Sequence, residues 1–73
     1  MSLGEKIREM RENAGLTQIS LAQKVGISQP ALARMEKGII SPSVQVGAEI
    51  ARALGCDLNE LVGFRDDSVN TGD

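Results

Sequence analysis

The 73-residue sequence contains no histidine, tryptophan or tyrosine, and it has a single cysteine and a single phenylalanine. Without histidine the chain lacks the usual general base and the histidine-assisted nucleophiles of hydrolytic enzymes. One cysteine, Cys56, cannot form an internal disulfide and cannot supply the four nitrogen or sulfur ligands of a structural zinc site. We therefore expect a protein that is not an enzyme and that holds no metal or cofactor.

Long apolar runs and a strong charge imbalance are also missing. No run approaches the ~20 residues of a membrane span, and the N-terminus lacks the apolar stretch of a signal peptide, so we expect a cytoplasmic protein without a membrane partner. The net charge of −2 is unevenly distributed. Residues 1–55 carry seven basic and five acidic side chains, whereas residues 56–73 carry one basic and five acidic side chains. Charge alone therefore identifies no partner.

Apolar residues recur at helical spacing along the chain, and glycines follow the periodic segments, as is typical of helix ends. The pattern predicts an all-α protein with five short helices, at about residues 3–14, 18–25, 29–37, 44–54 and 58–62. The expected N-caps of the last four are Thr17, Ser28, Ser43 and Asp57, with Gln29 as the alternative for the third because Pro30 follows it. We expect one domain over residues 1–64 and a frayed, acidic tail over residues 65–73.

The connection between the second and third predicted helices is unusually short. Only Gly26 and Ile27 separate Val25 from the Ser28 cap. Helices joined this tightly cross at a steep angle, which is the geometry of a helix-turn-helix motif. The same spacing also occurs in ordinary helix bundles, so the connection alone does not establish DNA binding.

The third predicted helix has one face without acidic residues. With ~100° per residue, Gln29, Ala33, Arg34 and Lys37 turn away from the apolar side that contains Leu32. Glutamine pairs bidentately with adenine and arginine with guanine, and a small alanine lets a helix approach the groove closely. Solvated helix faces often contain the same residue types, so this face favours DNA binding without proving it.

A pattern of fixed spacing extends over residues 3–62. It consists of Arg11-(x3)-Gly15-Leu16-Thr17-Gln18-(x2)-Leu21-Ala22-(x3)-Gly26-Ile27-Ser28, Glu36-x-Gly38, Pro42 and Ile50-Ala51-x-Ala53-Leu54-Gly55. This pattern resembles the phage repressor/Cro-type helix-turn-helix family, also called the xenobiotic-response-element type. The resemblance implies a compact five-helix bundle of the lambda-repressor-like type, with the helix-turn-helix in the second and third helices and the third helix in the major groove of double-stranded DNA.

The resemblance also implies roles for single residues. Gln18 matches a position that binds a phosphate, Ser28 and Gln29 match the positions that enter the groove first, and Arg34 matches a later base-reading position. We expect Ser28, Lys37 and Ser43 to add phosphate contacts.

Arg11 and Glu36 match a buried ion pair between the first and third helices. The helical wheel independently places Glu36 on the packed side, where an unpaired carboxylate is costly.

Three departures from the family pattern stand out. Ile19 replaces a residue that is usually polar, Gly47 replaces a large apolar residue, and the loop at residues 39–41 lacks a cation. The first predicts an exposed isoleucine beside the DNA face, and the second predicts a weaker fourth helix, by about 1 kcal/mol relative to alanine. The third predicts modest affinity for each monomer, so that dimerisation becomes important.

The C-terminal part of the predicted domain is rich in large apolar residues, namely Leu58, Leu61, Val62 and Phe64. We expect them to form the interface of a homodimer, and the alternative is that they complete the core of the monomer.

The leading interpretation is a sequence-specific transcriptional regulator, a repressor or controller, that binds a pseudo-palindromic operator as a homodimer. A phage repressor, a restriction–modification controller, an antitoxin and one domain of a longer regulator all fit this interpretation. The alternative is a protein-interaction module of the same fold, with a toxin or another protein as its partner. The acidic tail and the isoleucines at positions 19, 39 and 40 favour that alternative.

Overall fold

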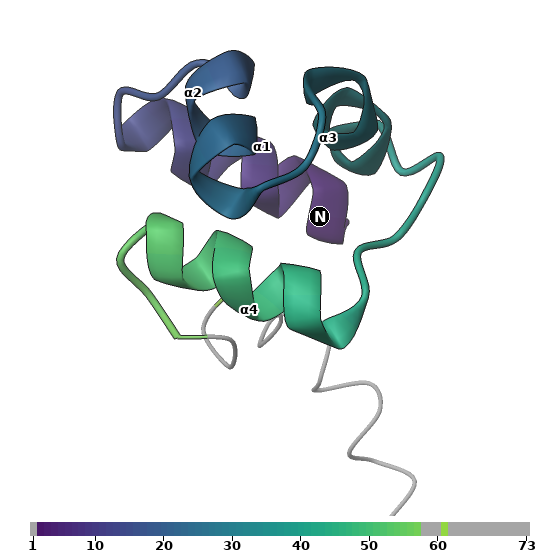
Figure 1. Cartoon of the computed structure of the whole chain (residues 1–73). Helices are drawn as coiled ribbons and strands as arrows, with labels where there is room; N and C mark the ends of the chain where they lie inside the picture. Colours follow the sequence, from purple (N-terminus) through teal and green to yellow (C-terminus); the bar gives the residue numbers. More distant parts are fainter. Residues whose placement is uncertain (1, 58–60, 62–73) are drawn as a thin grey trace, which may run out of the picture.

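The computed structural model describes residues 2–57 and Leu61, and this part of the chain is helical without any strand. Its helices are α1 (Leu3–Asn13), α2 (Gln18–Val25), α3 (Gln29–Glu36) and α4 (Val44–Ala53), which pack around one core (Figure 1). The all-α prediction is confirmed and four of the five predicted helices are present. The predicted fifth helix and the tail lie outside the described residues, apart from Leu61. None of the described helices has the length and apolar content needed to cross a membrane.

Each of these helices begins at a hydroxyl side chain that accepts a hydrogen bond from the backbone. The three predicted caps Thr17, Ser28 and Ser43 hold this position, and Ser28 rather than Gln29 caps α3. The cap of α1 is Ser2, which the sequence reading missed.

Ser2 forms a capping box with Glu5, in which each side chain accepts from the other's backbone N–H, at 2.9 and 3.2 Å. The hydrogen bond from the backbone of Ser2 holds the pKa of Glu5 below its ordinary value.

The turn between α2 and α3 depends on Gly26. This glycine has a φ of 84°, in the left-handed region that other residues rarely adopt, and its N–H donates to the Ala22 carbonyl at 2.8 Å. The N–H of Ile27 donates to the same carbonyl at 3.0 Å, and Ile27 packs against the core. The predicted two-residue connection is thereby confirmed, and α3 leaves α2 at the steep angle seen in Figure 1.

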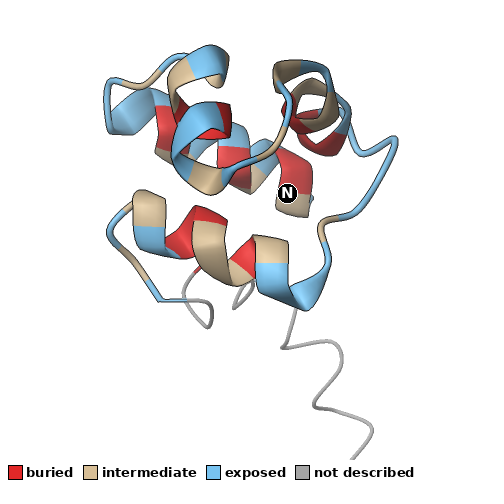
Figure 2. Ribbon diagram, viewed as in Figure 1, coloured by how far each residue is buried: buried red, intermediate tan, exposed pale blue. Residues whose placement is uncertain are grey.

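The core takes one large side chain from each helix and one from the C-terminal segment. These fully buried residues are Ile7, Leu21, Leu32, Ile50 and Leu61, and the helices turn their buried sides toward one another (Figure 2). The burial of Leu61 corrects the predicted dimer interface, because this side chain is used inside the monomer and offers no surface to a partner. The other three residues of that interface, Leu58, Val62 and Phe64, lie outside the described residues.

Gly4 allows α1 to approach the end of α3 very closely. A β-carbon at this position would lie 2.6 Å from the carbonyl oxygen of Glu36, which is closer than such atoms pack in proteins. The sequence signal for this contact is a glycine in the first turn of a predicted helix. Glycine lowers the stability of a helix, so its presence at such a position indicates that close packing requires it.

Gly4→Ala is expected to lower the free energy of unfolding by about 1–3 kcal/mol, because α1 must move away from α3 to relieve the overlap. Denaturant unfolding followed by circular dichroism measures the change. Gln45→Ala is the control, since this exposed position of α4 should tolerate alanine within about 0.5 kcal/mol. Equal unfolding midpoints for Gly4→Ala and the parent would show that α1 has room to shift.

Candidate nucleic-acid interface

The outward face of α3 has the residues that the sequence predicted. Ser28, Arg34 and Lys37 are exposed, and Gln29 and Ala33 are half-buried. On the opposite side Leu32, Met35 and Glu36 are buried. The division of α3 into a packed side and a free side is therefore confirmed.

Two cations on this face have no partner within the described chain. Arg34 and Lys37 make no hydrogen bond or ion pair there, whereas Arg8 and Arg52 are each paired with a glutamate of their own helix. Within α3 itself the exposed side carries no carboxylate, because Glu36 is buried. Both cationic side chains are thus free to reach an anionic or acceptor-rich partner.

Arg11 and Glu36 join α1 to α3 through a bidentate ion pair. Arg11 Nε lies 2.7 Å from Glu36 Oε2, and Arg11 Nη2 lies 3.2 Å from Oε1. A further hydrogen bond from Arg11 Nη1 reaches the Leu16 carbonyl at 2.8 Å. The Glu36 contact raises the pKa of Arg11 above its ordinary value. The structure therefore brings together the two residues that the resemblance paired.

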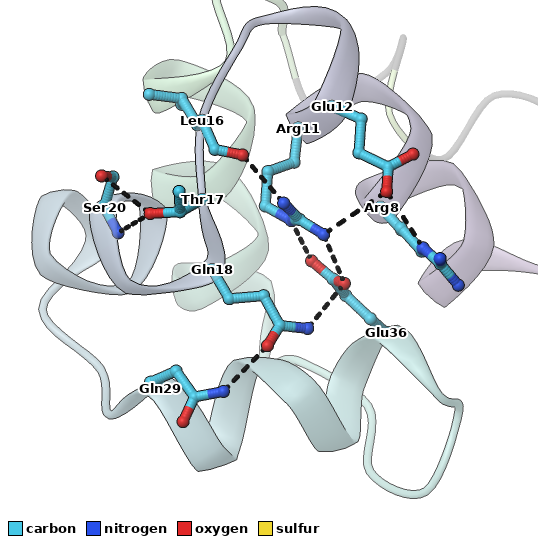
Figure 3. A network of polar contacts seen from close by, with 9 residues as sticks. All are labelled: Arg8, Arg11, Glu12, Leu16, Thr17, Gln18, Ser20, Gln29 and Glu36. Atoms are coloured by element: carbon cyan, nitrogen blue, oxygen red, sulfur yellow. Dashed lines mark hydrogen bonds and ion pairs between the residues drawn. The ribbon is translucent and has the colours of Figure 1, made fainter.

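Gln18 and Gln29 extend this ion pair to the start of α3, as Figure 3 shows. Gln18 Nε2 donates to Glu36 Oε1 at 3.0 Å, and Gln29 Nε2 donates to Gln18 Oε1 at 2.8 Å. The sequence predicted separate roles for the two glutamines and did not predict the contact between them. Each still has an unused N–H, since an amide group carries two.

A small cleft opens beside this network. It has a volume of about 140 Å³ and is lined by Arg8, Arg11, Gln18, Ala33, Glu36 and Lys37. Arg8 is a residue that the sequence reading missed as a candidate for binding. Its spacing was the available signal, because Arg8 precedes Arg11 by three residues and so shares its side of α1.

The capping serines retain a hydrogen-bond donor for a ligand. The hydroxyl oxygens of Ser28 and Ser43 accept from the N–H groups of Ala31 and Val46, at 3.2 and 3.1 Å. Each hydroxyl keeps its own proton and can donate it to an anion. Capping and anion binding are therefore compatible at both positions.

The loop from α3 to α4 and the start of α4 expose large apolar side chains to solvent. Ile39 is 66% exposed, Ile40 is 39% exposed, and Val44 at the start of α4 is 78% exposed. Ile19 on α2 is 60% exposed, as predicted.

Two helices joined by residues 26–28, with glutamine, arginine and lysine on the free side of the second helix, define a helix-turn-helix DNA-binding domain. A family model described as helix-turn-helix matches residues 7–61. The chain belongs to the Cro/C1-type helix-turn-helix family, a class of DNA-binding transcriptional regulators rather than of enzymes.

Similar proteins agree with this assignment. An HTH-type transcriptional regulator of Archaeoglobus fulgidus is 36% identical over 64 residues, which cover 88% of this chain and 91% of the relative. The immunity repressor protein of Bacillus phage phi105 is 35% identical over 86% of this chain, which spans only 44% of that repressor.

The P22 c2 repressor is similar in structure. Its DNA-binding domain in solution has a TM-score of 0.82 at 27% identity, covering 85% of this chain and 82% of that domain. Its crystal structure in complex with a synthetic operator has a TM-score of 0.79 at 28% identity, covering 84% and 92% of the two chains.

Proposed function

We propose that this protein is a sequence-specific repressor that binds a pseudo-palindromic operator as a homodimer in the cytoplasm, with α3 in the major groove. The observation that carries the proposal is the free side of α3, where Gln29 is joined by Arg34 and Lys37, which have no partner among the residues that the structure describes. The similarity to a phage immunity repressor and to a repressor solved with its operator supports it.

The contacts divide into two groups by chemistry. Gln29, Ala33 and Arg34 lie along the part of α3 that would face base edges, with Ser28 at its start. Gln18, Lys37 and Ser43 would bind phosphates together with the Ser28 hydroxyl. We add Arg8 to the second group, because it lines the same cleft as Gln18 and Lys37.

A dimer is needed to place two copies of α3 about 34 Å apart, one turn of DNA. We propose that Leu58, Val62 and Phe64 form its two-fold contact, with Leu61 excluded because it is buried in the core. The exposed Ile39 and Val44 are the alternative surface. A charged substitution in each group, Phe64→Glu or Val44→Glu, identifies the interface. Only the substitution that lies in the interface should lower the mass measured at tens of micromolar from that of a dimer toward that of a monomer.

The salt dependence of operator binding should be shallow for a dimer. Few cations face the DNA, so we expect about four to six neutralised phosphates and a fall in log K of about 4–5 per decade of salt. Duplex sites selected from a random pool, titrated at several salt concentrations, provide the measurement.

Arg8→Ala should reduce this slope by about 1 for each half-site, because one phosphate contact is lost. Arg52→Ala is the matched control, since Arg52 is also an exposed arginine paired with a glutamate of its own helix but does not line the cleft. A pool from which no sequence is enriched would reject the proposed function. Equal slopes for Arg8→Ala and Arg52→Ala would remove Arg8 from the interface.

A protein-interaction module of the same fold is the second candidate. The exposed Ile19 and Ile39 favour it, because covering large apolar side chains with a protein partner such as a toxin would remove them from water. Retention of the protein on DNA that is lost at high salt would favour the regulator, and retention that is absent at low salt would favour the interaction module.

A further inference from the structure

A continuous chain of hydrogen bonds connects the buried ion pair with the first residue of α3 (Figure 3). Arg11 holds both oxygens of Glu36, whose Oε1 also accepts from Gln18 Nε2 at 3.0 Å. Gln18 Oε1 then accepts from Gln29 Nε2 at 2.8 Å. One network thus contains residues of α1, α2 and α3 and ends on the residue that enters the groove first.

The charge on Glu36 determines the direction of every hydrogen bond in this chain. An ionised carboxylate only accepts, so Gln18 must turn its NH2 group toward Glu36 and its amide oxygen away. That oxygen requires an N–H group, so Gln29 must turn its own NH2 group toward Gln18. Reversing either amide would bring two oxygens, or two NH2 groups, face to face.

The groups that remain on Gln29 are its amide oxygen and one N–H. Adenine matches them in the major groove, because it offers an N6–H donor and an N7 acceptor. Guanine offers two acceptors, N7 and O6, and would match a Gln29 amide turned the other way, with both N–H groups outward.

We infer that Glu36, acting through Gln18, fixes the orientation of the Gln29 amide and thereby makes α3 select adenine over guanine. The inference rests on the proposed operator binding. Glu36 is a positioning residue in this scheme, since its side chain is only 3% exposed and Gln18 lies between it and Gln29 (Figure 3). If the Arg11–Glu36 pair served only to join α1 to α3, neutralising Glu36 would not change the base that Gln29 selects.

Glu36→Gln tests the inference, because the new amide can present either its oxygen or its NH2 group to Gln18. The base pair read by Gln29 is located first, as the operator position at which Gln29→Ala loses its preference. At this position we expect the parent to favour adenine over guanine by about tenfold or more. In Glu36→Gln the ratio of the two dissociation constants should fall below about threefold.

A second variant keeps the test decisive where Glu36→Gln fails to fold. Gln18→Leu leaves the Arg11–Glu36 pair intact and removes the link to Gln29, so the same ratio should fall. The overall affinity of Gln18→Leu for the operator should also drop, because a phosphate contact is lost. That loss weakens binding to the adenine and guanine sites alike, so it does not change the ratio of the two dissociation constants. Ile50→Val is the control, because Ile50 is buried on α4, which contributes no residue to the network, so this variant should lose stability and keep the preference for adenine.

The outcomes separate this inference from the proposed function. A parent protein that enriches no DNA sequence would overturn both. A parent that selects an operator, with the ratio lost in Gln29→Ala but retained in Glu36→Gln and Gln18→Leu, would overturn the role of Glu36 alone. Selection of guanine at the base pair read by Gln29 would do the same.

Discussion

Arg11→Ala is expected to lower the free energy of unfolding by about 3 kcal/mol or more, a large share of the stability of a small domain. The Glu36 carboxylate is 3% exposed and accepts two of its three side-chain hydrogen bonds from Arg11. Without the guanidinium it would remain a buried charge with only the Gln18 amide as a donor. Denaturant unfolding followed by circular dichroism gives the change directly.

Two control variants test whether the expected loss of unfolding free energy comes from the burial of the Arg11–Glu36 pair. Arg52→Ala removes an ion pair of 2.9 Å whose arginine is 73% exposed, and it should cost at most about 1 kcal/mol. Replacing Arg11 and Glu36 together by apolar residues should cost less than either single change, because no charge is then left buried. An unfolding midpoint for Arg11→Ala equal to that of Arg52→Ala would show that Glu36 reaches water.

The helices were predictable because their signals are local. The capping residues Thr17, Ser28 and Ser43 and the glycine at position 26 lie within a few residues of the backbone groups they satisfy. The role of Gly4 was not predictable, because its neighbour is the Glu36 carbonyl, 32 positions along the chain. Contacts of this kind depend on how helices cross, which periodicity does not encode.

The cost of Gly47 to the stability of α4 stays a prediction. The helix runs without interruption from Val44 to Ala53 with Gly47 buried within it, which is compatible with a lower stability than alanine would give. The N–H of Gly47 donates to the Ser43 carbonyl at 2.7 Å, as in any first helical turn. Local propensity is a weak preference, so one glycine does not interrupt a helix that packing supports.

The candidate site was predictable in part. Because a helix repeats every ~3.6 residues, the sequence alone placed Arg34 and Lys37 on the free side of α3 and Glu36 on the packed side. The contact between Gln18 and Gln29 was not predictable, since it depends on the crossing of α2 and α3. The sequence therefore identified which residues face outward but not how their hydrogen-bonding groups are oriented.

Arg34→Ala is expected to weaken operator binding by about 1–3 kcal/mol per half-site and to relax the preference at one or two base pairs. Arg34 lies five residues after Gln29 on α3, which is about 7.5 Å along the helix axis. A helix in the major groove would thus bring the two side chains to different base pairs. Arginine bonds bidentately to guanine, so guanine is the base whose preference should be lost.

Two matched variants distinguish base reading from phosphate binding by Arg34. Lys37→Ala, on the same side of α3, should weaken binding to all operator variants alike and lower the salt slope by about 1 per half-site. Arg34→Lys keeps the charge but loses the planar, bidentate geometry, so it should resemble Arg34→Ala in base preference and the parent in salt slope. Kd values for single-base operator variants provide the comparison. If Arg34→Ala loses the same factor on every variant and Arg34→Lys restores it, Arg34 binds the backbone and reads no base.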